Sequence, residues 1–215
     1  MRFAWTGVVA ASLLGGCALF RGPDMPQQPS EGRWLERKAA LERIDRFSLQ
    51  ARVASNGSLG MKGELRWQQN PDGSFDLRFA GPFGVGALSI AGNPTLVEVR
   101  SREGSQVTAD PEGWLQRKLG WTLPIGGLRY WALGLPAPGS PATIELDAEG
   151  EIAALEQDGW RLEYDEYQPA GPVSLPRRFQ LAKPEVTIKL VADRWEGLPG
   201  ADATPEAPAI QPAIQ

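Results

Sequence analysis

The chain has 215 residues, enough for one domain with a real apolar core, and its 22 basic and 26 acidic residues give a formal net charge of −4. This mildly acidic balance lacks the basic surface that nucleic-acid binding requires, so we expect no nucleic-acid partner. The sequence has no His and one Cys, which excludes Ser-His-Asp and Cys-His catalysis and His-containing metal sites.

The first residues have the layout of a secretory signal peptide. Arg2 supplies a positive charge, and an apolar run from Gly7 to Leu14 leads to small residues before Cys17. The run is too short for a membrane span, which takes about 20 apolar residues. Residues 14–17 (Leu-Gly-Gly-Cys) resemble the lipobox of bacterial lipoproteins. We predict cleavage after residue 16 and an N-acyl group and S-diacylglycerol on Cys17, with no other cofactor; a plain signal peptide is the alternative.

The residues after Cys17 predict a lipidated tether over 17–30, which is rich in Pro and Gln. In sorted lipoproteins, Asp directly after the Cys retains the protein in the inner membrane. Ala18 stands there instead, which implies the periplasmic face of the outer membrane. A helix is predicted over 31–46. We favour its packing on a sheet, and contact with the membrane surface is the alternative.

From Phe47 onward, apolar and polar residues alternate with a period of two, which predicts strands with one apolar and one wet face. Segments 47–54, 61–68 and 75–79 form three such strands joined by turns, which is an antiparallel meander. Further strands are predicted at 85–91, 96–100, 106–109, 143–147, 151–157, 160–166, 177–182 and 186–192. About eleven strands in one twisted sheet predict an incomplete, open antiparallel barrel.

The turn Gly81-Pro82-Phe83-Gly84 places an aromatic residue where hairpin tips are ordinarily polar. Phe83 has two interpretations: it folds back onto the core, or it protrudes toward a bilayer or a partner groove.

Two short helices interrupt the strands and are expected to cover the sheet. Asp110-Pro111 starts the first, which runs to Leu119, and the second lies within 124–135. The concave face and these helices would enclose an apolar cavity. The expected lining consists of Leu49, Leu65, Trp67, Phe75, Leu77, Phe79, Trp114, Leu115, Leu119, Trp131, Tyr164, Ile188 and Leu190.

The domain is expected to span 31–196, and the Pro- and Ala-rich segment 197–215 is expected to be disordered. Within 34–195 the chain resembles the LolB family. The pieces that carry the resemblance are 81–84 (Gly-Pro-Phe-Gly), 128–136 (Leu-Arg-Tyr-Trp-Ala-Leu-Gly-Leu-Pro), 159–164 (Gly-Trp-Arg-Leu-Glu-Tyr), 175–176 (Leu-Pro) and 188–190 (Ile-Lys-Leu).

The resemblance implies a mainly β half-barrel of eleven strands with a helical lid over an apolar cavity. It implies a receptor that accepts lipoproteins from the periplasmic carrier LolA and inserts them into the inner leaflet of the outer membrane, and we expect a monomer. It also implies that Phe83 is a membrane-insertion tip, where the family ordinarily has Leu. Arg129 is interpreted as a surface or hydrogen-bonded residue, with a role at the lid or a partner as the alternative.

Two other classes of function are alternatives to a lipoprotein receptor. A lipoprotein scaffold could dock envelope-assembly partners on the sheet without binding acyl chains. A hydrolase with paired carboxylates is disfavoured because Asp and Glu are dispersed at turns and strand edges. We therefore do not expect an enzyme.

Overall fold

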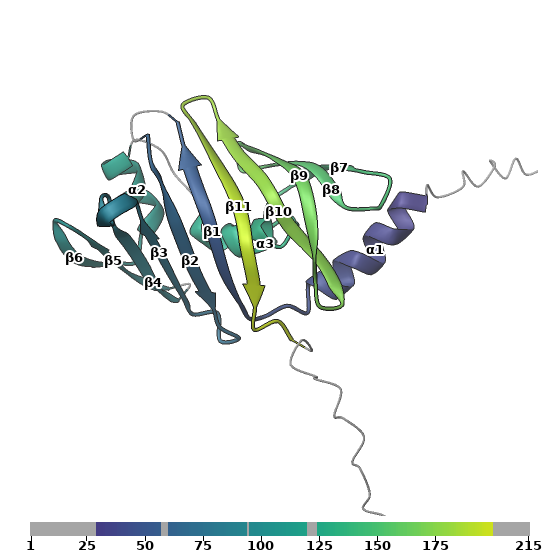
Figure 1. Cartoon of the computed structure of the whole chain (residues 1–215), viewed down its shortest axis with the longest axis horizontal. Coiled ribbons are helices and arrows are strands. Elements are labelled where there is room, and N and C mark those ends of the chain that lie inside the picture. Colours follow the sequence, from purple (N-terminus) through teal and green to yellow (C-terminus); the bar gives the residue numbers. More distant parts are fainter. Residues whose placement is uncertain (1–28, 57–59, 94, 120–123, 200–215) are drawn as a thin grey trace, which may run out of the picture.

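A single antiparallel sheet of eleven strands dominates the molecule (Figure 1). The computed structural model describes residues 29–56, 60–93, 95–119 and 124–199. The strands are β1 (Phe47–Ser55), β2 (Lys62–Gln69), β3 (Phe75–Ala80), β4 (Leu88–Asn93), β5 (Leu96–Ser101), β6 (Gly104–Thr108), β7 (Ala142–Leu146), β8 (Ile152–Gln157), β9 (Trp160–Ala170), β10 (Val173–Lys183) and β11 (Val186–Glu196). The predicted open sheet is confirmed.

The strand order is β6-β5-β4-β3-β2-β1-β11-β10-β9-β8-β7, so pairing of β1 with β11 joins the two ends of the domain. The period-two pattern explains which residues lie on the apolar face of the sheet and which lie on the exposed face. Leu49 pairs with Trp67 on the apolar face, and the neighbouring pair Gln50 and Arg66 is exposed on the other face.

Three α-helices accompany the sheet: α1 (Pro29–Leu41), α2 (Pro111–Leu119) and α3 (Ile125–Ala132). Figure 1 shows α3 behind the middle of the curved sheet and α1 beside the end formed by β7 to β10. A short 3₁₀ turn, η1 (Pro82–Gly84), follows β3.

Helix α1 packs on the sheet, as the sequence favoured, but it ends at Leu41 instead of residue 46. The amides of Arg43 and Ile44 bond three residues back, to Ala40 and Leu41, which tightens and closes the last turn. Ile44 then enters the core just before β1. Arg37 fixes the helix through an ion pair of 3.1 Å with Glu151.

The hairpin of β9 and β10 is longer than the predicted segments 160–166 and 177–182. The added segments contain Pro169 and Pro176, although proline cannot donate to the ladder. The structure accommodates Pro176 beside a register irregularity between Pro176 and Arg178. The fourth strand is shorter than predicted and begins at Leu88, since residues 85–87 still belong to the turn region.

The core consists of two clusters of buried apolar residues. The main cluster runs from Trp34 of α1 to Leu198, a residue within the expected tail. The smaller cluster joins α2 to β4 and β5 through Ile90, Val97, Val99, Trp114 and Leu115. The predicted leader 1–16, the predicted lipidation site Cys17, residues 18–28 of the predicted tether and residues 200–215 lie outside the described residues. The last two residues of the predicted tether, Pro29 and Ser30, belong to α1 instead.

Candidate functional site

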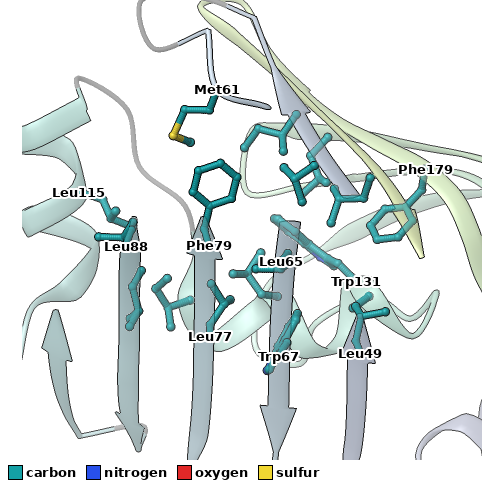
Figure 2. Close-up of a pocket in the computed structure, with 18 residues that line it drawn as sticks. Leu49, Met61, Leu65, Trp67, Leu77, Phe79, Leu88, Leu115, Trp131 and Phe179 are labelled. Carbon is teal, nitrogen blue, oxygen red and sulfur yellow. The ribbon is translucent and has the colours of Figure 1, made fainter. Parts of the chain in front are cut away.

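The concave face of the sheet and the helices α2 and α3 line a partly open cavity of about 130 Å³ (Figure 2). Every side chain that lines it is apolar or aromatic. The predicted residues that line it are Leu49, Leu65, Trp67, Leu77, Phe79, Leu115, Trp131, Ile188 and Leu190.

Some predicted lining residues lie elsewhere. Trp114 belongs to the smaller cluster, where its indole N–H donates to Gln106 Oε1 at 3.1 Å. It is adjacent to Leu115 on the helix, and neighbours differ in direction by about 100°, so only Leu115 reaches the cavity. Phe75 lines a neighbouring pocket, and Tyr164 is buried against α3. The side chain of Leu119 lies outside the described part of the chain.

Sequence reasoning also missed several lining residues. They come from β1, β4, β10, α3 and the residue just before β2, and the period-two alternation could have found most of those on strands. They are Val53, Met61, Leu88, Ile90, Phe179, Leu181, Ile125, Leu128 and Ala132.

A buried hydrogen-bond network fixes the C-terminal end of α3. Gln157, only 3% exposed, accepts from Trp131 Nε1 and from the Ala137 amide, both at 2.8 Å, and donates to the Ala137 carbonyl. The Tyr164 hydroxyl donates to the Trp131 carbonyl at 2.8 Å. Burial raises the pKa of this phenol well above its ordinary value. The floor of the cavity at Trp131 is therefore rigidly held.

A wider pocket of about 510 Å³ adjoins the cavity and shares the lining residues Trp67, Leu77, Ile125 and Leu128 with it. Its rim is polar. The guanidinium of Arg129 lies 4.7 Å from the ring centre of Tyr130, and its Nε atom is buried without a hydrogen-bond partner.

Glu112 also lines this pocket, and burial raises the pKa of its carboxyl. The dry cavity therefore continues into a space with polar groups, a combination that suits an amphipathic ligand.

Phe83 protrudes, which decides between its two interpretations: its side chain is fully exposed, and Val85 beside it is 62% exposed. The backbone of Phe83 has φ 56°, in the left-handed region that costs a non-glycine residue about 1 kcal/mol. Short turns hold it there, with the Gly81 amide donating to the Val85 carbonyl at 2.9 Å and the Gly84 amide to the Gly81 carbonyl at 3.0 Å. Backbone hydrogen bonds of the turn thus hold the side chain of Phe83 in its exposed position.

Within residues 29–56, 60–93, 95–119 and 124–199, no group of three or more acidic, His or Cys side chains is placed to hold a metal ion. None of the helices in these ranges is long and apolar enough to cross a bilayer.

The sequence of this chain is similar to known proteins of one family. Residues 45–195 match the family described as "Outer membrane lipoprotein LolB". A protein named outer-membrane lipoprotein LolB from Nitrosococcus oceani is 37% identical over 201 residues, covering 91% of this chain and 99% of the relative. Its namesake from Chromohalobacter salexigens is 35% identical over 193 residues, covering 89% of each.

Among solved structures, a LolA superfamily protein from Nitrosomonas europaea aligns with a TM-score of 0.47 at 10% identity, covering 77% of this chain and 92% of that protein. The family match and both LolB relatives extend over most of the described domain, including the cavity strands and the exposed tip. This chain therefore belongs to the LolB family.

Proposed function

We propose that this chain is an outer-membrane lipoprotein, anchored on the periplasmic face through Cys17, that receives lipoproteins from LolA and inserts them into that membrane. The observation that carries the proposal is the cavity, because its lining is entirely apolar and lies between sheet and helices. Such a lining suits hydrocarbon and offers nothing to a polar substrate.

The chemistry of the cargo explains why a cavity is needed. Hiding a CH₂ group from water contributes about 0.8 kcal/mol, so exposing an acyl chain of ~16 carbons costs on the order of 10 kcal/mol. A lipoprotein therefore crosses the periplasm only if its chains stay covered. The sequence has no phosphate-binding loop of the Walker type, so transfer runs downhill in affinity from carrier to receptor to bilayer.

The cavity, at about 130 Å³, is too small for that cargo. A cavity of about 150 Å³ accommodates benzene, and ordinary ligand pockets measure about 300–1,000 Å³. A volume of about 130 Å³ thus describes a resting form that must widen when acyl chains enter. The adjoining pocket of about 510 Å³ supplies room for the polar end of the cargo.

The tip gives the receptor its second contact. A fully buried Phe side chain contributes about 1.5–3 kcal/mol, so Phe83 at the bilayer surface holds the domain against the membrane during release. The short turns at its base keep it outward, which avoids an ordering cost on insertion.

The cavity is tested with Leu77→Trp, which adds bulk to the cavity lining on β3. We expect the variant to fold and to accept less acylated lipoprotein from LolA, and to bind a fluorescent fatty acid several-fold more weakly. The control is Leu96→Trp, at an exposed position of β5. Unchanged binding of both ligands by the cavity variant would contradict acyl binding there and favour a scaffold without lipid.

The tip is tested with Phe83→Glu, followed by transfer from LolA to outer-membrane vesicles. We expect normal acceptance of cargo and a large loss of insertion, because the charge resists entry into the bilayer. Val107→Glu is the matched control, since Val107 is also exposed but lies on β6 away from the tip. If the tip variant inserts cargo as well as the control does, Phe83 is structural only.

A further inference from the structure

A groove of about 520 Å³ lies on the outer face of the sheet, at the base of the exposed tip. It extends from Pro82 and Phe83 across the ends of β2, β1 and β11. Two lysines lie in it, Lys62 of β2 and Lys189 of β11. Both pair across the sheet with the same small residue, Ala54 of β1, so they flank it on either side.

These two lysines differ from the other cations of the outer face. Arg52 is held by Asp193 at 2.8 Å, Arg78 by Asp76 at 2.5 Å, and Arg66 lies 4.0 Å from Glu64. Among the residues that the structure describes, Lys62 and Lys189 are exposed and have neither an ion pair nor a hydrogen bond through their ammonium groups. The groove contains one carboxylate, that of Glu64, and this carboxylate lies 4.0 Å from the guanidinium of Arg66.

The spacing suits a phosphate. Adjacent strands lie about 4.8 Å apart, so the two backbones are about 10 Å apart across Ala54. Lysine side chains are long enough to converge from that distance on one anionic group. Ala54 between them leaves the space open, which is why the groove exists at this point.

We propose that Lys62 and Lys189 bind the phosphate of an anionic phospholipid headgroup when the tip enters the bilayer. This inference rests on the proposed membrane role of Phe83 and adds a recognition of lipid charge to it. A membrane is the favoured occupant because the groove is continuous with the exposed Phe83, so that entry of the tip brings both lysines to headgroup depth. An overall acidic chain thereby presents two unpaired lysines where the membrane lies.

The test uses the chain from residue 18 onward, which keeps every described residue and removes the lipid anchor that would mask weak binding. Co-sedimentation is measured with vesicles of neutral phosphatidylcholine and with vesicles that also contain phosphatidylglycerol. For Lys62→Gln/Lys189→Gln we expect binding to the anionic vesicles to fall about 30-fold, since each basic residue near such a surface contributes about fivefold. Binding to neutral vesicles should be unchanged.

The control is Arg46→Gln/Arg102→Gln, which removes two exposed positive charges away from the groove. If it lowers anionic binding as much as the lysine pair does, only net charge matters and the headgroup site is wrong. Raising the salt concentration should erase the difference between wild type and the lysine variant, because salt screens exposed charges.

Phe83→Ser separates this inference from the proposal on which it rests. A loss of binding to both vesicle types with Phe83→Ser, but not with the lysine variant, supports the tip and overturns the headgroup site. Unchanged binding with Phe83→Ser overturns the tip itself. If the lysine variant binds anionic vesicles normally but accepts less cargo from LolA, the groove is a protein-docking surface and the lipid inference is wrong.

Discussion

Gln157 is, with Gln69, one of the two buried polar residues in the described part of the chain, and its contacts explain why it is buried. Its side-chain oxygen accepts from the Trp131 indole N–H and from the Ala137 amide, and its side-chain nitrogen donates to the Ala137 carbonyl, each at 2.8 Å. Replacing it with Leu leaves these groups buried without partners. At about 1–3 kcal/mol for each unsatisfied group, partly relieved by relaxation, we expect Gln157→Leu to lower the free energy of unfolding by about 2–4 kcal/mol.

Urea denaturation measures this change. The control is Gln50→Leu, at an exposed position of β1, for which a change within about 0.5 kcal/mol is expected. Equal stability of the two variants would mean that the Gln157 network does not anchor α3.

Tyr164 makes the stability of the fold sensitive to alkaline pH. Burial raises the pKa of its hydroxyl well above the ordinary value of about 10 that the unfolded chain retains. Above that pH the unfolded chain loses the proton while the folded chain keeps it. The unfolded state then binds fewer protons, so the free energy of unfolding is intact below about pH 10 and falls as the pH rises further.

In Tyr164→Phe this contribution disappears. We expect a loss of about 1 kcal/mol at pH 7, from the missing bond to the Trp131 carbonyl, and a shallower decline between pH 10 and 11 than in wild type. Urea denaturation across that range measures both, and Tyr130→Phe on the half-buried face of α3 is the control. If the free energy of unfolding of Tyr164→Phe falls as steeply above pH 10 as that of wild type, Tyr164 is not the source of the alkaline sensitivity.

At the level of single elements, two glycines should respond in opposite directions to the same substitution. A Cβ on Gly63 of β2 would lie 2.3 Å from the Ala80 carbonyl oxygen and 2.8 Å from Gly81 Cα. Gly63→Ala should therefore push apart β2 and the base of the tip, at a cost of about 1–3 kcal/mol. Gly126 of α3 has no atom within 4 Å of such a Cβ, and Ala favours a helix there by about 0.5–1 kcal/mol.

Urea denaturation of Gly63→Ala and Gly126→Ala measures the change in the free energy of unfolding, which should be negative for the first and positive for the second. Vesicle binding adds a second readout, because only the first variant disturbs the strand end that leads to Phe83. Destabilisation by Gly126→Ala, or none by Gly63→Ala, would show that the close approach at Ala80 is not what requires glycine.

The strands were predictable from the sequence because one apolar and one wet face force an alternation that local residues record. The first strand illustrates this: Leu49, Ala51 and Val53 alternate with Gln50 and Arg52, and the structure buries the first set. Element ends were less predictable, since they depend on tertiary contacts. Ile44 leaves the helical pattern to enter the core, and Pro176 is tolerated only through an irregularity in the ladder.

The cavity lining likewise contains residues that the sequence predicts and residues that depend on tertiary packing. Inward strand residues such as Leu65 and Leu77 follow from the period of two. Helical neighbours do not, because Trp114 and Leu115 are both apolar and only the packed position of α2 decides which one lines the cavity. The Gln157 network was equally invisible, since its partners lie 20 and 26 residues away in the chain.

The whole molecule consists of two parts that share the cavity. We call β4, β5, β6 and α2 the wing, which is held together by the smaller cluster, and the remaining elements the body. The wing contributes Leu88, Ile90 and Leu115 to the cavity lining, and the body contributes the rest. Because Trp131 and the end of α3 are fixed to the body by Gln157 and Tyr164, widening is expected where the wing meets the body.

Spin labels test this motion. In the chain from residue 18 onward, which has no native Cys, Arg117→Cys on α2 and Arg66→Cys on β2 report the distance from wing to body. Arg66→Cys with Arg178→Cys on β10 reports within the body and is the control. A saturating fatty acid should lengthen the first distance and leave the second unchanged, since a cavity of about 130 Å³ must at least double to hold a chain. If the fatty acid binds and neither distance changes, the chain finds its space without the wing, in the adjoining pocket beside Arg129.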